Sequence, residues 1–399
     1  MSAPFLPYGR QSIDDTDIAA VAAALRSDWL TTGPAVAAFE DAFAAEVGAP
    51  FALACANGTA ALHLAMMALE IGPGDAAIVP SITFVATANA AHYVGATPVF
   101  ADVDPQTGLM PVAALEDAIA RARAAGLRPK VALPVHYAGQ TAPMRALAQV
   151  ACAHGLHLVE DACHALGTVS DAGPVGACGM SVLSTFSFHP VKTIACGEGG
   201  MVTTRDAALA ERIRRDRSHG LVRDPGRFSD AALSVGPDGQ ANPWAYEMPA
   251  PGYNYRLSDI NAALGSSQMA RLSWFAARRR RLAALYAEAL APLSPQVKPL
   301  AAAPGCDPVL HLQVALIDFA GLGLSRGVVM RALAARGIGS QVHYIPVHRQ
   351  PFYAAMHPGL TLPGAEAFYA RCLSLPLFPD MADPDVERVV AALADVLGL

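Results

Sequence analysis

The chain has 399 residues, of which 53% are hydrophobic, so it is long enough for two or three domains on a prior of roughly 150 residues each. Its 28 Lys and Arg against 34 Asp and Glu give a formal net charge of −6, which argues against a general electrostatic partner such as nucleic acid. The longest stretch without a charged side chain, 76–101, contains two prolines and a glycine and does not predict a membrane span. The beginning of the chain has neither a secretory nor a transit-peptide pattern, so we expect a cytoplasmic protein.

Seven cysteines are scattered along the chain as an odd set. They form no Cys-x-x-Cys pair and no Cys/His spacing suited to zinc, so we predict neither disulfide bonds nor a metal site. Free cysteines usually pack as small buried hydrophobes. The set is Cys55, Cys152, Cys163, Cys178, Cys196, Cys306 and Cys372.

From about 51 to 202, short runs of Val, Ala, Leu and Phe alternate with longer Ala-rich helical patterns. This alternation is typical of a parallel sheet flanked by helices and predicts the α/β class. We expect strands over 51–55, 76–79, 99–103, 131–136, 157–161, 180–188 and 201–204. We expect helices over 60–69, 83–94 and 144–153.

The pattern changes beyond this region. Residues 222–255 are rich in Gly, Pro, Asp and Ser and predict a long irregular connection, which we expect near the active site because such segments are usually functional. A helical stretch follows over 258–290 and carries four arginines at 278–281, most simply as a solvated helix face. We predict a large domain over 1–270, and a smaller carboxy-terminal α/β domain over 271–399 that begins with a linking helix.

Asn57, Gly58 and Thr59 lie between a predicted strand and a predicted helix, where ligands of open α/β sheets bind. Glycine lets an anion approach the backbone, free N–H groups at the helix start point at it, and the Thr59 hydroxyl can donate. The segment suits one phosphate, although it lacks the lysine and the spacing of a P-loop. The alternative is an ordinary helix cap made by Asn57 or Thr59.

Asp161 ends an apolar run directly after Glu160. A carboxylate at a strand end is buried only if it meets a cation or strong donors, because an unpaired buried charge costs several kcal/mol. A protonated heterocyclic nitrogen would satisfy it. The alternative is an exposed acid that caps the next turn.

Lys192 lies in an apolar and aromatic segment, 184–192, that contains almost no other charge. Desolvation lowers the proton affinity of an amine, and a lysine can form a Schiff base with the aldehyde of pyridoxal phosphate. The alternative is a surface charge. One phosphate cradle, one carboxylate after a strand and one such lysine are the three anchors that pyridoxal phosphate requires.

With these anchors in place, the sequence resembles the DegT/DnrJ/EryC1/StrS group of sugar-nucleotide aminotransferases over nearly its whole length. The resemblance implies an aspartate-aminotransferase-like fold, fold type I of the pyridoxal phosphate enzymes, with the mostly parallel sheet in the large domain. The segments that carry it are WLTTGP (29–34), NGTAAL (57–62), PSITFVAT (80–87), EDACHALG (160–167), SFHPVK (187–192), GEGG (197–200), YNYRLSD (253–259) and VHY (342–344).

The resemblance implies that Lys192 is the catalytic residue and forms the Schiff base, that Asp161 pairs with the pyridinium nitrogen and that Phe84 stacks on the ring. His164 is implied near the phenolic oxygen of the cofactor; the alternative is a buried histidine satisfied by backbone. The residues implied to hold the cofactor phosphate are Gly58, Thr59 and Ser187.

Asn254 is implied to reach the cofactor phosphate of the neighbouring subunit, which predicts a homodimer with shared active sites. Cys196, close to Lys192 in sequence, is expected to be a packing residue, and no role is assigned to His189.

The reaction implied is transamination from L-glutamate to a keto-sugar on a nucleoside diphosphate. Some relatives carry histidine in place of the lysine and dehydrate sugars, so Lys192 favours aminotransfer. The segments 186–192, 254–260 and 341–346 are most similar to members that aminate C4 of UDP-2-acetamido-2,6-dideoxy-β-L-arabino-hex-4-ulose on the route to pseudaminic acid. Tyr8 and His343 are then candidate sugar contacts.

Other interpretations remain open from the sequence. The acceptor could be a dTDP-linked 4-keto-6-deoxyhexose or the UDP-4-keto-pentose used in lipid A modification. A pyridoxal phosphate lyase, or a non-catalytic module that only binds the cofactor, belongs to a different functional class.

Overall fold

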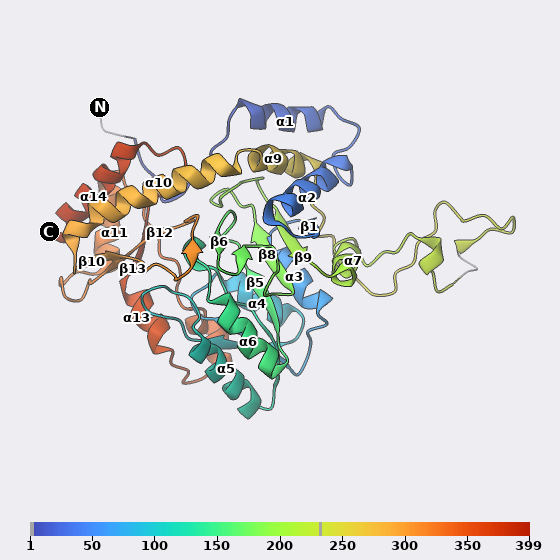
Figure 1. Ribbon diagram of the computed structural model, residues 1–399, viewed down its shortest axis with the longest axis horizontal. Helices are drawn as coiled ribbons and strands as arrows, with labels where there is room; N and C mark the ends of the chain where they lie inside the picture. The colour runs from blue at the N-terminus through green and yellow to red at the C-terminus, as the bar shows by residue number, and fades with distance from the viewer. Residues whose placement is uncertain (1–3, 231–233) are drawn as a thin grey trace.

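The computed structural model describes residues 4–230 and 234–399, and its centre is a seven-stranded sheet (Figure 1). The strand order is β1-β9-β8-β5-β4-β2-β3. β9 runs antiparallel to both neighbours, and the other adjacent strands are parallel, so the predicted α/β class with a mostly parallel sheet is confirmed. The strands are β1 (Phe51–Cys55), β2 (Asp75–Pro80), β3 (Thr97–Ala101), β4 (Arg128–Ala132), β5 (His157–Asp161), β8 (Leu183–Ser187) and β9 (Gly200–Thr204).

Helices cover both faces of this sheet because successive strand residues point to opposite faces. In β1, Leu53 and Cys55 pack in the cluster formed with α3, α4 and α7, whereas Ala52 and Ala54 pack in the cluster formed with α2 and α9. α5 and α6 cover that second face at the β3 end of the sheet. The helices are α2 (Pro34–Val47), α3 (Gly58–Ala68), α4 (Val85–Tyr93), α5 (Val112–Ala124), α6 (Met144–His154), α7 (Ala207–Asp216) and α9 (Asp259–Met269).

The carboxy-terminal part contains an antiparallel sheet of order β10-β12-β13, on which α10, α11 and α14 pack. The amino-terminal segment joins this part, because the N–H of Leu6 donates to Gly337 O (2.8 Å) and the N–H of Gly339 donates to Leu6 O (2.7 Å). The division at 270/271 stays a prediction. The elements are β10 (Val297–Pro299), β12 (Gln313–Ile317), β13 (Cys372–Leu375), α10 (Leu272–Leu290), α11 (Arg326–Ala335), α12 (Pro351–Met356), α13 (Pro363–Arg371) and α14 (Asp383–Leu397).

The remaining elements are short or peripheral. A small antiparallel sheet pairs β11 with β6 and β6 with β7, and α1 lies against α9 at the edge of the molecule (Figure 1). In the ranges that the structure describes, no helix combines the length and the apolar composition of a membrane span. The bounds are α1 (Asp15–Leu25), β6 (Val169–Ser170), β7 (Gly173–Pro174) and β11 (Cys306–Asp307).

The helix expected over 258–290 is two helices, α9 and α10, separated at Ala270 and Arg271. The solvated arginine face expected on it is partly wrong. Arg279 is 1% exposed and donates from Nη1 to the carbonyls of Leu310 (3.1 Å) and His311 (3.3 Å). Four consecutive helical residues span most of the circumference at 3.6 residues per turn, so one of the four arginines has to face the core.

The irregular connection expected over 222–255 is an arm that extends away from the sheets (Figure 1). Its two sides meet through backbone bridges between Val222 and Glu247 and between Val235 and Ala241. Residues 231–233 lie outside the described part of the chain. The expectation that this segment lies near the active site holds only for its end, where Tyr255 O accepts the N–H of Ala56 (2.7 Å) next to the start of α3.

Candidate active site

A cavity of about 700 Å³ opens at the carboxyl ends of β1, β5 and β8, the edge where open α/β sheets bind their ligands. The carboxy-terminal part closes it with residues 341–345, so the two parts of the chain share one site. Among the predicted site residues, the structure brings together Tyr8, Gly58, Thr59, Phe84, Asp161, His164, Ser187, Lys192 and His343.

One end of the cavity is built by the turn from β1 into α3. The Asn57 side chain caps α3 by accepting the N–H of Ala60 (2.8 Å), and the first N–H groups of a helix have no partner within it. A Cβ on Gly58 would lie 2.7 Å from the Cβ of Ser187, so only glycine allows the two loops to approach this closely. The same turn can therefore both cap α3 through Asn57 and offer free N–H groups to an anion. The hydroxyls of Thr59 and Ser187 line the cavity beside these N–H groups.

Asp161 ends β5 and is 5% exposed, which makes the exposed-acid alternative wrong. Its Oδ2 accepts the hydroxyl of Thr87 (2.7 Å), and its Oδ1 accepts the N–H of Cys163 (3.2 Å). These donors stabilise a carboxylate in a buried place and leave it further lone pairs for a ligand in the cavity.

Lys192 follows β8 and lines the same cavity as Asp161, so it is not a surface charge. Burial lowers the pKa of the Lys192 amine, and the negative charges that Cys163 and Asp161 can carry oppose this shift. A lowered pKa increases the neutral fraction of the amine, the form that attacks an aldehyde and accepts a proton.

Two of the predicted histidines are held uncharged by burial. His164 accepts the N–H of Ala138 at Nδ1 (3.3 Å) and pairs through Nε2 with the Tyr344 hydroxyl (3.1 Å), and burial lowers its pKa well below the usual value. His343 pairs with the Ser374 hydroxyl (2.8 Å), and burial followed by the charge of Lys192 lowers its pKa to about 3. His343 can exchange a hydrogen bond with a ligand through its other ring nitrogen, and neither histidine supplies a positive charge.

Aromatic side chains also line the cavity. Phe84, at the start of α4, is 56% exposed, and its ring centroid lies 6.0 Å from that of Tyr344. The Tyr8 ring lies 5.3 Å from the His343 ring, which joins the amino-terminal segment to the carboxy-terminal wall. An exposed phenylalanine beside a buried carboxylate suits a planar heterocyclic ligand.

Asn254 does not line this cavity in the single chain. It is exposed and its backbone pairs with Ser218. Its neighbours Tyr253 and Tyr255 line a second cavity of about 480 Å³, which shares Asn57 and Thr59 with the first.

The two residues without an assigned role differ in their surroundings. His189 is exposed at the rim of the cavity, whereas Cys196 is fully buried. Burial raises the pKa of the Cys196 thiol, which favours its uncharged form as a packing group.

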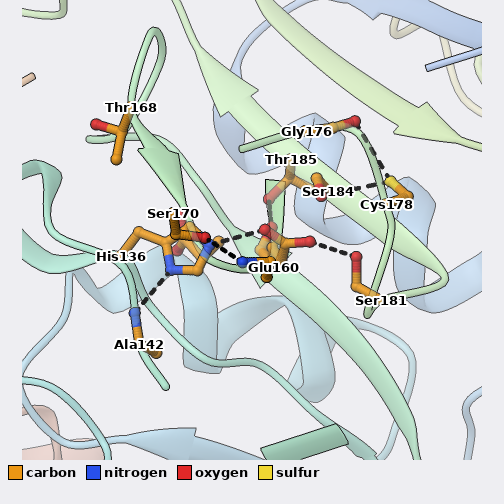
Figure 2. A network of polar contacts seen from close by, with 12 residues as sticks. His136, Ala142, Glu160, Thr168, Ser170, Gly176, Cys178, Ser181, Ser184 and Thr185 are labelled. Atoms are coloured by element: carbon orange, nitrogen blue, oxygen red, sulfur yellow. Dashed lines mark hydrogen bonds and ion pairs between the residues drawn. The ribbon is translucent and has the colours of Figure 1, made fainter. Parts of the chain in front are cut away.

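Glu160 lies on the opposite face of the sheet from Asp161, because adjacent strand residues alternate. Figure 2 shows that it accepts from His136 Nε2 (2.8 Å) and from the Ser181 hydroxyl, while His136 Nδ1 accepts the N–H of Ala142 (3.2 Å). Burial alone would raise the pKa of Glu160, but the hydrogen bonds from His136 and the serine hydroxyls hold it below the usual value. This buried pair anchors the strand end that carries Asp161, whose carbonyl accepts the N–H of His136 (3.0 Å).

Sequence reasoning missed several residues that line the cavity, including Thr87, Cys163, His311 and Tyr344. Thr87 lies three positions after Phe84, one helical turn away, and that spacing is the signal that could have indicated it. His311 is brought to the site by a loop before β12, and its ring lies 4.4 Å from that of His164. No local pattern around His311 predicts this contact.

The residues present fit pyridoxal 5'-phosphate. A close-packed glycine turn suits its phosphate, a buried carboxylate suits its ring nitrogen, and a lysine of lowered pKa in the same cavity suits its aldehyde. A cavity of about 700 Å³ also leaves room for a second ligand beside the cofactor.

Residues 11–394 match the model of the DegT/DnrJ/EryC1/StrS aminotransferase family, and the chain belongs to this family. It is therefore an aminotransferase that uses pyridoxal 5'-phosphate, and the fold expected from the resemblance is confirmed.

Solved structures of sugar aminotransferases are similar over the whole chain. Helicobacter pylori PseC, described as an aminotransferase of pseudoaminic acid biosynthesis, is 28% identical with a TM-score of 0.88 over 99% of both chains. The putative sugar aminotransferase Spr1654 from Streptococcus pneumoniae, solved in its PMP form, is 29% identical with a TM-score of 0.87 over 100% of this chain and 99% of that one. S. venezuelae DesV is 34% identical with a TM-score of 0.84 over 100% of both chains.

Proposed function

We propose that the enzyme transfers the amino group of L-glutamate to C4 of a UDP-linked 4-keto-6-deoxy-N-acetylhexosamine, giving UDP-4-amino-4,6-dideoxy-N-acetyl-β-L-altrosamine. The observation that carries the aminotransfer is that Lys192 and Asp161 line one cavity together with the glycine turn at Gly58. The choice of acceptor is supported by the similarity to PseC over 99% of both chains. The roles of the individual site residues belong to the same proposal.

Each residue has a defined task in this reaction. The cofactor, when bound, supplies the electron sink for cleavage of the C–H bond. Nζ of Lys192 takes the proton from the α-carbon of the amino donor and later returns a proton, which requires the neutral amine that burial favours. Asp161 accepts a hydrogen bond from the protonated ring nitrogen, Phe84 covers the ring, and the hydroxyls of Thr59 and Ser187 hold the phosphate.

Tyr8 and His343 are proposed to contact the sugar. They stand together at the side of the cavity formed by the carboxy-terminal part. Because His343 is neutral, it recognises sugar hydroxyl or amide groups by hydrogen bonding and gives no charge to the diphosphate.

We further propose a homodimer in which Asn254 of each subunit reaches the partner's cofactor phosphate. Among the described residues that line the cavity, Lys192 is the only lysine or arginine, whereas glutamate and a nucleotide sugar each carry at least two negative charges. The exposed position of Asn254, and large exposed aromatic side chains such as Tyr93 and Tyr253, support a second subunit at this face. Sedimentation of the holoenzyme tests this: a monomer at micromolar concentration contradicts it. A cytoplasmic location stays a prediction.

A second acceptor class has its own support. DesI, solved in the presence of its TDP-sugar product, is 33% identical with a TM-score of 0.85 over 100% of this chain and 94% of that one. Incubation with glutamate and a panel of keto-sugars separates the candidates: the UDP-linked hexosamine, a dTDP-linked 4-keto-6-deoxyhexose and a UDP-linked 4-keto-pentose. We expect the UDP-linked hexosamine to be aminated at C4, as read by NMR of the product. Faster turnover of the dTDP-linked sugar would show that the proposed UDP-linked acceptor is wrong and that a dTDP-linked sugar is the acceptor.

Lys192→Ala tests the catalytic assignment. We expect the variant to fold, to lose the covalent link that borohydride reduction fixes in the wild type, and to lose turnover by about 10⁴-fold or more, as expected for loss of a group that acts as both nucleophile and base. Lys298→Ala, at an exposed lysine of β10, is the matched control and should behave as wild type. Mass spectrometry after borohydride reduction shows whether the cofactor is covalently attached to the protein. Cofactor still attached to Lys192→Ala would refute the role of Lys192 as the residue that forms the Schiff base.

A further inference from the structure

The first turn of α4 reaches the buried carboxylate at the end of β5. Thr87, with no exposed surface, donates its hydroxyl to Asp161 Oδ2 at 2.7 Å, a shorter bond than the one that the N–H of Cys163 donates to Asp161 Oδ1 at 3.2 Å. The alternation of β5 explains the contact, because Asp161 points to the sheet face that α4 covers whereas Glu160 points to the other.

The single proton of the Thr87 hydroxyl has a defined direction. The other acceptors within reach are the carbonyl of Phe84 at 3.2 Å and the hydroxyl oxygen of Thr83 at 2.8 Å, and both are neutral and more distant than the carboxylate. A hydrogen bond to an ionised acceptor is shorter and stronger than one to a neutral acceptor, so the proton lies towards Asp161. The Thr83 hydroxyl, 2.8 Å from Thr87 Oγ1, then has to be the donor in that pair. The result is a relay from Thr83 through Thr87 to Asp161.

The same turn carries the aromatic wall. Phe84 lies between the two threonines, and its carbonyl also accepts the backbone N–H of Thr87 at 3.2 Å. Both threonines are buried, while the Phe84 ring is exposed into the cavity. One helical turn therefore fixes the acid that would bind the ring nitrogen and the side chain that would cover the ring.

We infer that Thr87, with Thr83 behind it, is a positioning residue that holds the Asp161 carboxylate in the orientation that meets the ring nitrogen of the bound cofactor, and thereby favours the protonated form of that nitrogen. This inference rests on the role proposed for Asp161 and is independent of which sugar is the acceptor. A side chain that only stabilised α4 would act on folding and would leave the protonation of the cofactor unchanged.

Thr87→Val removes the hydroxyl at nearly constant volume, and Thr87→Ser keeps it. The holoenzymes are reconstituted with pyridoxal phosphate labelled with ¹⁵N in the ring, and the ¹⁵N chemical shift reports the protonation of that nitrogen. We expect Thr87→Val to move the shift towards the unprotonated value and to weaken cofactor binding about tenfold to a hundredfold, the range for loss of a hydrogen bond to a charged group. Thr87→Ser should stay within about threefold of wild type, well below the cost of losing such a bond.

Asp161→Asn is the reference variant. If Asp161→Asn leaves the ¹⁵N shift at the wild-type value, the role of Asp161 itself fails, and with it the basis of this inference. If Asp161→Asn moves the shift while Thr87→Val leaves both the shift and the affinity unchanged, the inference about Thr87 is overturned and the proposed function stands.

Thr83→Val provides the second variant should Thr87→Val not fold. It leaves the Thr87 hydroxyl in place and removes the donor behind it. We expect a change in the ¹⁵N shift of the same direction and smaller size. A Thr83→Val holoenzyme identical to wild type in shift and cofactor affinity would then overturn the relay.

Discussion

The buried His343 predicts a loss of stability in mild acid. Its pKa in the folded protein is about 3, because burial and the nearby Lys192 charge disfavour the protonated ring, whereas an unfolded histidine titrates near 6.5. Between these two values the unfolded chain binds a proton that the folded chain does not, so the free energy of unfolding falls as the pH falls. From pH 7 to pH 5 this one group removes about 2 kcal/mol. His164 and His311, whose pKa values burial lowers well below the usual value, act in the same direction.

Urea unfolding of the wild type and His343→Gln at several pH values between 5 and 7 measures this term. Glutamine keeps a hydrogen-bonding group beside Ser374 and has no titration in this range, so the variant should lose about 2 kcal/mol less than wild type between pH 7 and pH 5. His189→Gln is the control, because His189 is exposed, and it should follow the wild-type profile. Parallel profiles for wild type and His343→Gln would refute the reasoning, since the folded protein would then bind the proton as readily as the unfolded chain.

Two further predictions concern the cradle and the buried pair. Gly58→Ala places a Cβ 2.7 Å from that of Ser187, so the turn has to shift, and we expect cofactor titration of the apoenzyme to show binding weakened about tenfold or more. Unchanged affinity in Gly58→Ala would contradict the close approach. Glu160→Gln removes the charge that His136 faces and should lower the free energy of unfolding by about 1–3 kcal/mol, measured in urea. Turnover should change less than about threefold because Glu160 faces away from the cavity, and a loss of turnover out of proportion to stability would speak against this placement.

Local patterns predicted the parts of the fold that local physics decides. β1 and β5 have the predicted bounds, because each is a short apolar run that ends at polar or small residues. β4 begins at Arg128, three residues before the predicted start. The prediction began too late because the first residues of the strand are polar and include Pro129, which is unusual inside a strand. The break between α9 and α10 has no comparable signal in the sequence.

The anchors of the site were predictable because each follows a strand in sequence, and strand ends of a parallel sheet converge. The residues that hold these anchors in place were not predictable. The contact of Thr87 with Asp161 joins residues 74 positions apart, and His311 meets His164 only after the carboxy-terminal part has folded against the sheet. Arg279 was unpredictable for the same reason. Nothing in a run of four arginines indicates which one is buried and donates to the carbonyls of Leu310 and His311.

The amino-terminal segment is attached by its backbone to the carboxy-terminal part of the chain. The backbone of Leu6 is hydrogen-bonded to Gly337 and to Gly339, and the carbonyl of Tyr8 accepts the N–H of Leu377 (3.0 Å). The place of Tyr8 on the cavity wall beside His343 therefore depends on backbone bonds that tie the first described residues to the carboxy-terminal part.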